Sequence, residues 1–108
     1  MNDFADVFGN PVVIQAPPSE IIIEGNSVRL QCSLKEGKME NNVMNWYRQR
    51  DGQSPEYISR EGKDYGIGFK ERFVAEIDDS NNKFSLEIKT AHIEDSGVHY
   101  CGAREHID

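Results

Sequence analysis

The stretch Glu94-Asp95-Ser96-Gly97-Val98-His99-Tyr100-Cys101 constrains the fold of this chain more than any other. It reads as a turn followed by a short strand that ends in a cysteine. An acid, a glycine, a ring and a thiol occupy positions 95, 97, 99 and 101, so all four lie on one face of an extended chain. The only other cysteine is Cys32, and the only tryptophan, Trp46, lies between the two cysteines. The strand that ends at Cys101 is therefore predicted to be buried on this face.

Short runs of alternating apolar and polar residues, separated by turn signals, recur along the chain and predict strands. The predicted strands cover residues 28–34, 43–49, 55–60, 73–77 and 84–88, after a first strand that Pro17-Pro18 breaks and residues 19–23 resume. Residues 35–42 and 61–68 are polar and contain glycine, so they are predicted to be loops. Several short strands at this spacing favour an all-β fold in which two antiparallel sheets pack as a sandwich.

Length and charge bound the function. The 108 residues make one domain of ordinary size, and 19 acidic against 12 basic residues give a formal charge of −7. This balance argues against nucleic acid and against an anionic membrane surface as partners. Residues 1–10 show no clear period and are predicted to be a loose leader or an expression remnant, with a single domain over 11–108. The longest wholly aliphatic run is 21–23, so no membrane span is predicted.

The two cysteines suit a single disulfide formed in an oxidising compartment, and the alternative is a pair of free buried thiols. Candidate zinc ligands are present, but none of them follows a metal-binding spacing. These candidates are His92, His99, His106 and Cys101. The chain also lacks the short motifs of hydrolases, metalloproteases and phosphate-binding loops. The sequence therefore predicts no enzyme, no metal and no cofactor.

The order Cys32…Trp46…Cys101, closed by Asp-x-Gly-x-(ring)-x-Cys, resembles the immunoglobulin variable-type domain. Trp46-Tyr47-Arg48-Gln49, together with residues 69–73 and 84–88, looks most like a T-cell receptor alpha or delta variable segment. The resemblance implies a disulfide between the two cysteines that packs on Trp46. It also implies an ion pair between Arg72 and Asp95 beneath the sandwich and an extracellular, cell-surface location with any anchor outside this chain. The expected core residues are Trp46, Leu30, Leu86 and His99.

The chain departs from the family pattern in two ways. His99 stands where the family usually has the tyrosine of the tyrosine corner. It is predicted to be buried and held neutral by a backbone hydrogen bond, because burial disfavours the imidazolium. After Cys101 the chain has no Phe-Gly-x-Gly bulge. The last strand of the family is therefore predicted to be missing or supplied from elsewhere, and residues 103–108 are not expected to form a full strand.

The resemblance implies a recognition module rather than a catalyst. A pairing face toward another variable-type domain, in a hetero- or homodimer, is expected at Tyr47, Gln49, Pro55, Tyr57 and Tyr100. Loops that contact a protein or peptide-presenting ligand are expected to contain Lys38, Glu40, Asn41, Lys63, Asp64, Tyr65, Arg104 and Glu105. Their mixed charges indicate no ligand class. The same fold also serves co-receptor, adhesion and innate inhibitory modules, and surrogate-chain-like domains that borrow their last strand from a partner.

Overall fold

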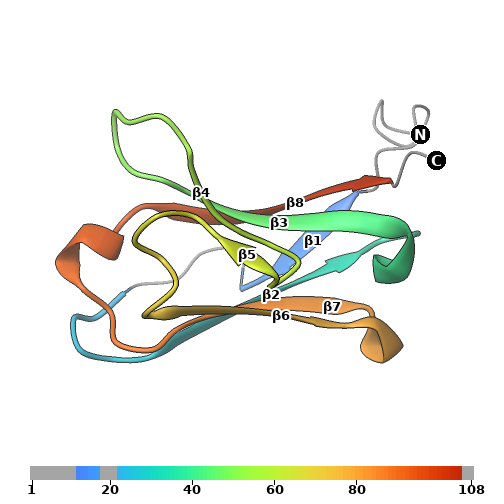
Figure 1. The fold of residues 1–108 in the computed structure, drawn as a ribbon, viewed down its shortest axis with the longest axis horizontal. Helices are drawn as coiled ribbons and strands as arrows, with labels where there is room; N and C mark the ends of the chain where they lie inside the picture. The colour runs from blue at the N-terminus through green and yellow to red at the C-terminus, as the bar shows by residue number, and fades with distance from the viewer. Residues whose placement is uncertain (1–11, 18–21, 106–108) are drawn as a thin grey trace.

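A computed structural model describes residues 12–17 and 22–105, and its strands form two antiparallel sheets that lie one over the other (Figure 1). The strand order is β1-β2-β7-β6 in one sheet and β5-β4-β3-β8 in the other. The first sheet contains β1 (Val13–Ala16), β2 (Val28–Leu34), β7 (Lys83–Ile88) and β6 (Phe73–Asp78). The second contains β5 (Asp64–Tyr65), β4 (Glu56–Arg60), β3 (Asn42–Gln49) and β8 (Val98–Glu105). Three single turns of 3-10 helix join strands: η1 (Met39–Asn41), η2 (Asp79–Asn81) and η3 (Ile93–Asp95).

The core lies between the sheets and follows the period of two. Alternate residues of β2 are buried, as are the alternate residues of β3 that include Trp46. Trp46 stands opposite Cys101 in the β3–β8 register, and its ring centroid is 5.8 Å from that of Phe84, which stands opposite Cys32 in the β2–β7 register. The disulfide between Cys32 and Cys101 thus ties one sheet to the other at the tryptophan. Leu30 and Leu86 are buried beside it.

Most predicted strands form where their period of two places them, and the differences have local causes. The two-residue strand β5 lies inside the segment 61–68 that the sequence predicts to be a loop. Ile22 and Ile23, predicted to resume the first strand, are not in a strand, and residues 18–21 lie outside the described part. The expectation that Arg104 and Glu105 lie in a loop is wrong, because β8 continues to Glu105 by pairing with β3 as far as Asn42. Residues 1–10 and 106–108 also lie outside the description.

The edge of β8 that faces away from β3 carries no paired strand within the described residues. The side chain of Gln15, on β1, occupies part of this edge. Its Nε2 donates to the backbone oxygen of His99 at 2.7 Å, and its Oε1 accepts the N–H of Cys101 at 3.3 Å. One amide side chain therefore bridges the first strand of one sheet to the last strand of the other and satisfies two groups that a neighbouring strand would otherwise bind.

Candidate functional site

Three tyrosines form a row across the outer face of the β5-β4-β3-β8 sheet, and we call them the tyrosine row. Tyr47 stands opposite Tyr57 of β4 and opposite Tyr100 of β8. Its ring stacks on Tyr100 at a centroid distance of 5.4 Å and meets the edge of Tyr57 at 6.4 Å. Burial, followed by the charge of Asp64, raises the pKa of Tyr57, so its hydroxyl stays neutral. The row is an apolar strip with polar tips, the chemistry that suits a protein interface.

The other two residues of the predicted pairing face lie apart from this row. Gln49 is exposed at the end of β3, opposite Val98, and its Nε2 donates to the backbone oxygen of Gln53 at 3.2 Å. Pro55 is exposed and precedes β4 rather than belonging to it. Val98 lies at the same end of the sheet with 64% of its surface exposed, and it extends the apolar character of this face.

At one end of the sandwich a carboxylate is buried between two guanidinium groups. Asp95, in η3, is fully buried and accepts from both terminal nitrogens of Arg72, at 2.7 and 3.0 Å. It also accepts from Arg48 Nη1 at 3.0 Å and from the N–H of His92 at 2.7 Å. Burial alone would raise the pKa of Asp95, but the bonds and charges of these donors outweigh it and hold the pKa below its usual value. The expected Arg72–Asp95 pair is therefore part of a larger network.

The larger network contains three residues to which the sequence analysis assigned no role: Arg48, Glu56 and Arg50. Arg48, only 7% exposed, also donates Nε to Glu56 at 3.0 Å and Nη2 at 3.3 Å, in a forked arrangement. Arg50 donates to both oxygens of the same carboxylate. The hydrogen bond from Arg48 is the chief cause of the lowered pKa of Glu56. The period of two contained the signal, because it places Arg48 on the inward face of β3 with Trp46, where a charge requires partners.

His99 faces this network from β8, opposite Arg48 in the strand register. Its side chain is buried, and its Nε2 has no hydrogen-bond partner, so the expected backbone bond to the imidazole is absent at that nitrogen. Burial is the first cause that lowers the pKa of His99, to about 4, and the positive charge of Arg48 is the second. Asp95 and Glu56 act in the opposite direction. The imidazole is consequently neutral in the folded protein at physiological pH.

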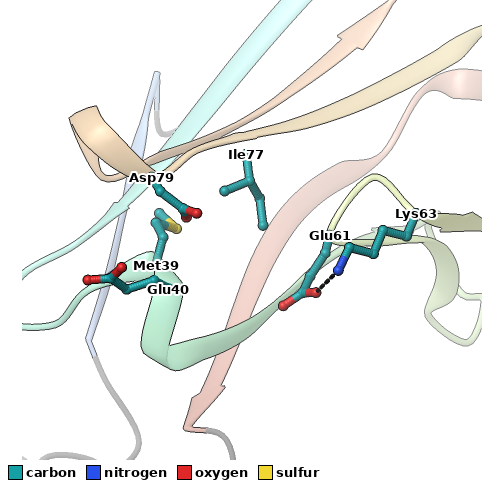
Figure 2. A pocket seen from close by; sticks show the side chains of 6 residues that line it. All are labelled: Met39, Glu40, Glu61, Lys63, Ile77 and Asp79. Carbon is teal, nitrogen blue, oxygen red and sulfur yellow. Dashed lines mark ion pairs between the residues drawn. The ribbon is translucent and has the colours of Figure 1, made fainter.

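η1, η2 and the turn between β4 and β5 lie at the end of the sandwich opposite η3 (Figure 1). Residues of these segments and of β6 line a pocket of about 320 Å³. It is lined by Met39, Glu40, Glu61, Lys63, Ile77 and Asp79. Figure 2 shows Met39 directed toward Asp79 and Ile77, with Glu61 and Lys63 joined across 3.6 Å on the side of the turn. Among the described residues Glu40 and Asp79 have no cationic partner within ion-pairing distance.

Some of the expected ligand residues lie at this end of the sandwich, and the others lie in ion pairs, against the core or within β8. Lys38, Glu40, Asn41 and Lys63 are exposed around η1 and the turn. Asp64 pairs with Arg60 at 2.7 Å, while Tyr65 packs against the core and its hydroxyl accepts the N–H of Ala75 at 3.0 Å. Arg104 and Glu105 are exposed but lie within β8, not in a loop.

Asn82, to which the sequence analysis assigned no role, connects the loop that contains η1 to the turn that contains η2. It follows η2 in the left-handed conformation, with φ of 56°. Its Oδ1 accepts the N–H of Met39 at 2.8 Å, and its Nδ2 donates to the backbone oxygen of Gly37 at 2.9 Å. The only hint in the sequence is an asparagine in a turn, because asparagine tolerates the left-handed region better than most residues.

Comparison with known families agrees with this architecture. The family model of the immunoglobulin V-set domain matches residues 15–107. The chain belongs to the immunoglobulin V-set family. V-set domains are typically receptor-like recognition modules without enzymatic activity. The disulfide is compatible with an extracellular location for this V-set domain.

The described part of the V-set domain contains neither a metal-binding cluster nor a membrane-spanning helix. In residues 12–17 and 22–105, no three histidine, cysteine, aspartate or glutamate side chains are grouped so that they could hold a metal ion. Over the same described part of the V-set domain, no helix is long and apolar enough to cross a membrane.

Proposed function

We propose that this V-set domain is an extracellular recognition domain of an immune receptor, and that it pairs with another variable-type domain through the tyrosine row. The observation that carries the proposal is the contact of Tyr47 with Tyr57 on one side and Tyr100 on the other. Rings that are held by their neighbours lose little side-chain freedom when a partner covers them, and such rings contribute strongly to protein interfaces.

The outer face of the second sheet gives the contrast that supports this choice. There Arg29 stands opposite Glu87, and its Nη2 donates to the hydroxyl of Ser85 at 3.4 Å. Arg29 is exposed, and charged side chains favour contact with water. Within the described strands, the aromatic residues that lie on an outer face are thus all on the β5-β4-β3-β8 sheet.

The ligand surface in this proposal is the end that contains η1, η2 and the β4–β5 turn. It includes Lys38, Glu40, Asn41 and Lys63 around the pocket. The likeness of Trp46-Tyr47-Arg48-Gln49 to T-cell receptor alpha and delta variable segments supports an antigen-receptor chain as the parent protein. The ligand would be a protein or a peptide-presenting protein, since the loops offer mixed charges and no cofactor-binding motif.

The proposal is tested by replacing Tyr47 with aspartate and measuring association by sedimentation velocity over a wide range of concentration. Pairing would bury an unpaired carboxylate, so we expect the dissociation constant of a homodimer to rise at least about tenfold, the equivalent of 1.4 kcal/mol. Ile14→Asp is the matched control, because Ile14 is an exposed apolar residue on β1 of the other sheet. A domain that stays monomeric before and after the change would rule out pairing with a second copy.

A second candidate function is favoured by the edge of β8. Within the described residues, only Gln15 binds the backbone groups at this edge. The remaining edge could accept a strand from a partner, which would make this a surrogate-chain-like domain. A synthetic joining-type peptide with a Phe-Gly-x-Gly motif should raise the melting temperature when added in trans. A peptide of the same composition in scrambled order should not, and equal effects of the two peptides would exclude strand addition.

A further inference from the structure

We infer that Asn82 is a positioning residue for the ligand end: it clasps the loop of residues 37–41 to the β6–β7 turn and fixes that loop before any ligand arrives. The side chain of Asn82 bonds both Gly37 and Met39, which precede it by 45 and 43 positions in the sequence. Among the described residues of the β6–β7 turn, no other side chain binds the backbone of the loop 37–41. The consequence for ligand affinity rests on the proposed function, whereas the clasp itself does not.

The clasp needs the chemistry of asparagine. The amide group provides the acceptor for the N–H of Met39 and the donor for the oxygen of Gly37 on two separate atoms, Oδ1 and Nδ2, so one short side chain makes both bonds at once. The backbone at position 82 is left-handed, with φ of 56° and ψ of 45°, which asparagine and glycine adopt more readily than other residues. Aspartate could supply only the acceptor, and glycine could supply only the backbone conformation.

The loop also holds itself closed around Lys38. The backbone oxygen of Lys38 accepts from the N–H of Asn41 at 3.0 Å and from Nδ2 of Asn42 at 2.7 Å. These bonds make η1 a compact unit, and the clasp sets where that unit sits. With Met39 only 1% exposed, the unit is anchored by an apolar side chain beneath it and by Asn82 at its side.

The position of η1 determines the ligand surface. Glu40 and Met39 line the pocket from η1, and Asp79 lines it from η2, which immediately precedes Asn82 in the chain (Figure 2). Asn82 therefore fixes the distance between two walls of the pocket without lining it. A loop that is ordered in advance loses less conformational entropy on binding, so the clasp favours affinity through pre-organisation.

The test is the hydrogen exchange of the Met39 amide, measured by NMR on the whole domain. In Asn82→Gly the backbone conformation is retained and both side-chain bonds are lost, so we expect the Met39 amide to exchange roughly five- to tenfold faster. The amide of Leu86, in the central strand β7, should be unchanged. In Asn82→Asp the acceptor for Met39 remains and the donor to Gly37 is lost, so the Met39 amide should exchange at a rate between those of the wild type and Asn82→Gly. Asn81→Ala is the control, because the Asn81 side chain bonds Asp78 and no other described residue.

Each contrary outcome overturns the inference. An unchanged Met39 rate in Asn82→Gly would show that the clasp does not hold the loop. An equal acceleration at Leu86 would show a general loss of stability instead of a local role. Asn82→Asp exchanging as fast as Asn82→Gly would exclude Oδ1 as the acceptor, and an equal effect of Asn81→Ala would remove the assignment to position 82. None of these results bears on the Tyr47 sedimentation experiment, so the pairing proposal stands or falls separately.

Discussion

The two ends of the sandwich use carboxylates in opposite ways. At the end that contains η3, Asp95 is fully buried and is bound by two guanidinium groups and a backbone N–H. At the end that contains η1 and η2, Asp79 and Glu40 are exposed and line a pocket, without a cationic partner among the described residues. The same chemical group thus holds the fold together at one end and is available for contact at the other.

The difference shows how the cost of burial separates structure from recognition. A buried charge is tolerated only when hydrogen bonds and opposite charges replace its water, so Asp95 requires all of its partners to stay in place. Arg72 illustrates this requirement, because its hydrogen bond to Asp95 raises its pKa above the usual value. An exposed carboxylate keeps its water and can exchange it for a ligand at small cost to the fold.

The comparison predicts the largest effect for Asp95→Asn. The amide keeps the size of the side chain but removes its charge, and it leaves the buried guanidinium of Arg48 with one carboxylate partner instead of two. Breaking a buried ion pair in this way costs about 3–5 kcal/mol in the free energy of unfolding. Urea denaturation at pH 7 measures the loss. A loss below about 1 kcal/mol would show that Glu56 and solvent compensate, and the two ends would then differ less than the structure indicates.

The next effect is a loss of stability in mild acid through His99. Its pKa is about 4 in the folded protein, against roughly 6.5 in the unfolded chain, so the unfolded state binds the proton first as the pH falls. Stability contributed by the neutral imidazole is therefore complete above about pH 6.5 and is lost progressively down to about pH 4. A difference of this size corresponds to about 3 kcal/mol.

The charged groups that face His99 are Arg48 from β3, Asp95 from η3 and Glu56 from β4. The two carboxylates have lowered pKa values, so their own contributions begin to be lost near their unfolded values of 3.8 and 4.5 and overlap the window of the histidine only at its acid end. His99→Tyr should flatten the dependence of unfolding free energy on pH between 6.5 and 4, measured by urea titration at several pH values. An unchanged slope would assign the acid sensitivity to other groups.

The strands could be predicted from the sequence, because a half-buried strand carries its own period of two. Val28, Leu30, Cys32 and Leu34 alternate with exposed or partly exposed residues, and β2 covers that segment. The tyrosine row follows from the same rule, since Tyr47 had to face away from Trp46. What periodicity did not give is the end of β8, whose pairing with β3 depends on the partner strand as well as on its own residues.

The two ends were predictable only in part, because their contacts join residues that are distant in the sequence. The Arg72–Asp95 pair came from a family pattern, while Glu56 reaches Arg48 only through the β3–β4 hairpin. Asn82 meets Gly37 and Met39 because the two loops lie at the same end of the sandwich, which no local pattern reports. Tyr65 was expected to face a ligand, yet it turns inward and its hydroxyl binds Ala75 of the other sheet.

The smallest effect is expected for Asp79→Asn, the same carboxylate-to-amide change made at the end that contains η1 and η2. Asp79 is exposed and has no ion-pair partner among the described residues, and its backbone oxygen, which accepts the N–H of Asn82, is unaffected by the substitution. The free energy of unfolding should therefore change by less than about 0.5 kcal/mol, as for most surface substitutions. The measurement is a urea titration in parallel with Asp95→Asn, so that both changes are read in one buffer. If Asp79→Asn lowered the free energy of unfolding as much as Asp95→Asn, the pocket carboxylate would also support the fold, and the contrast between the two ends would be wrong.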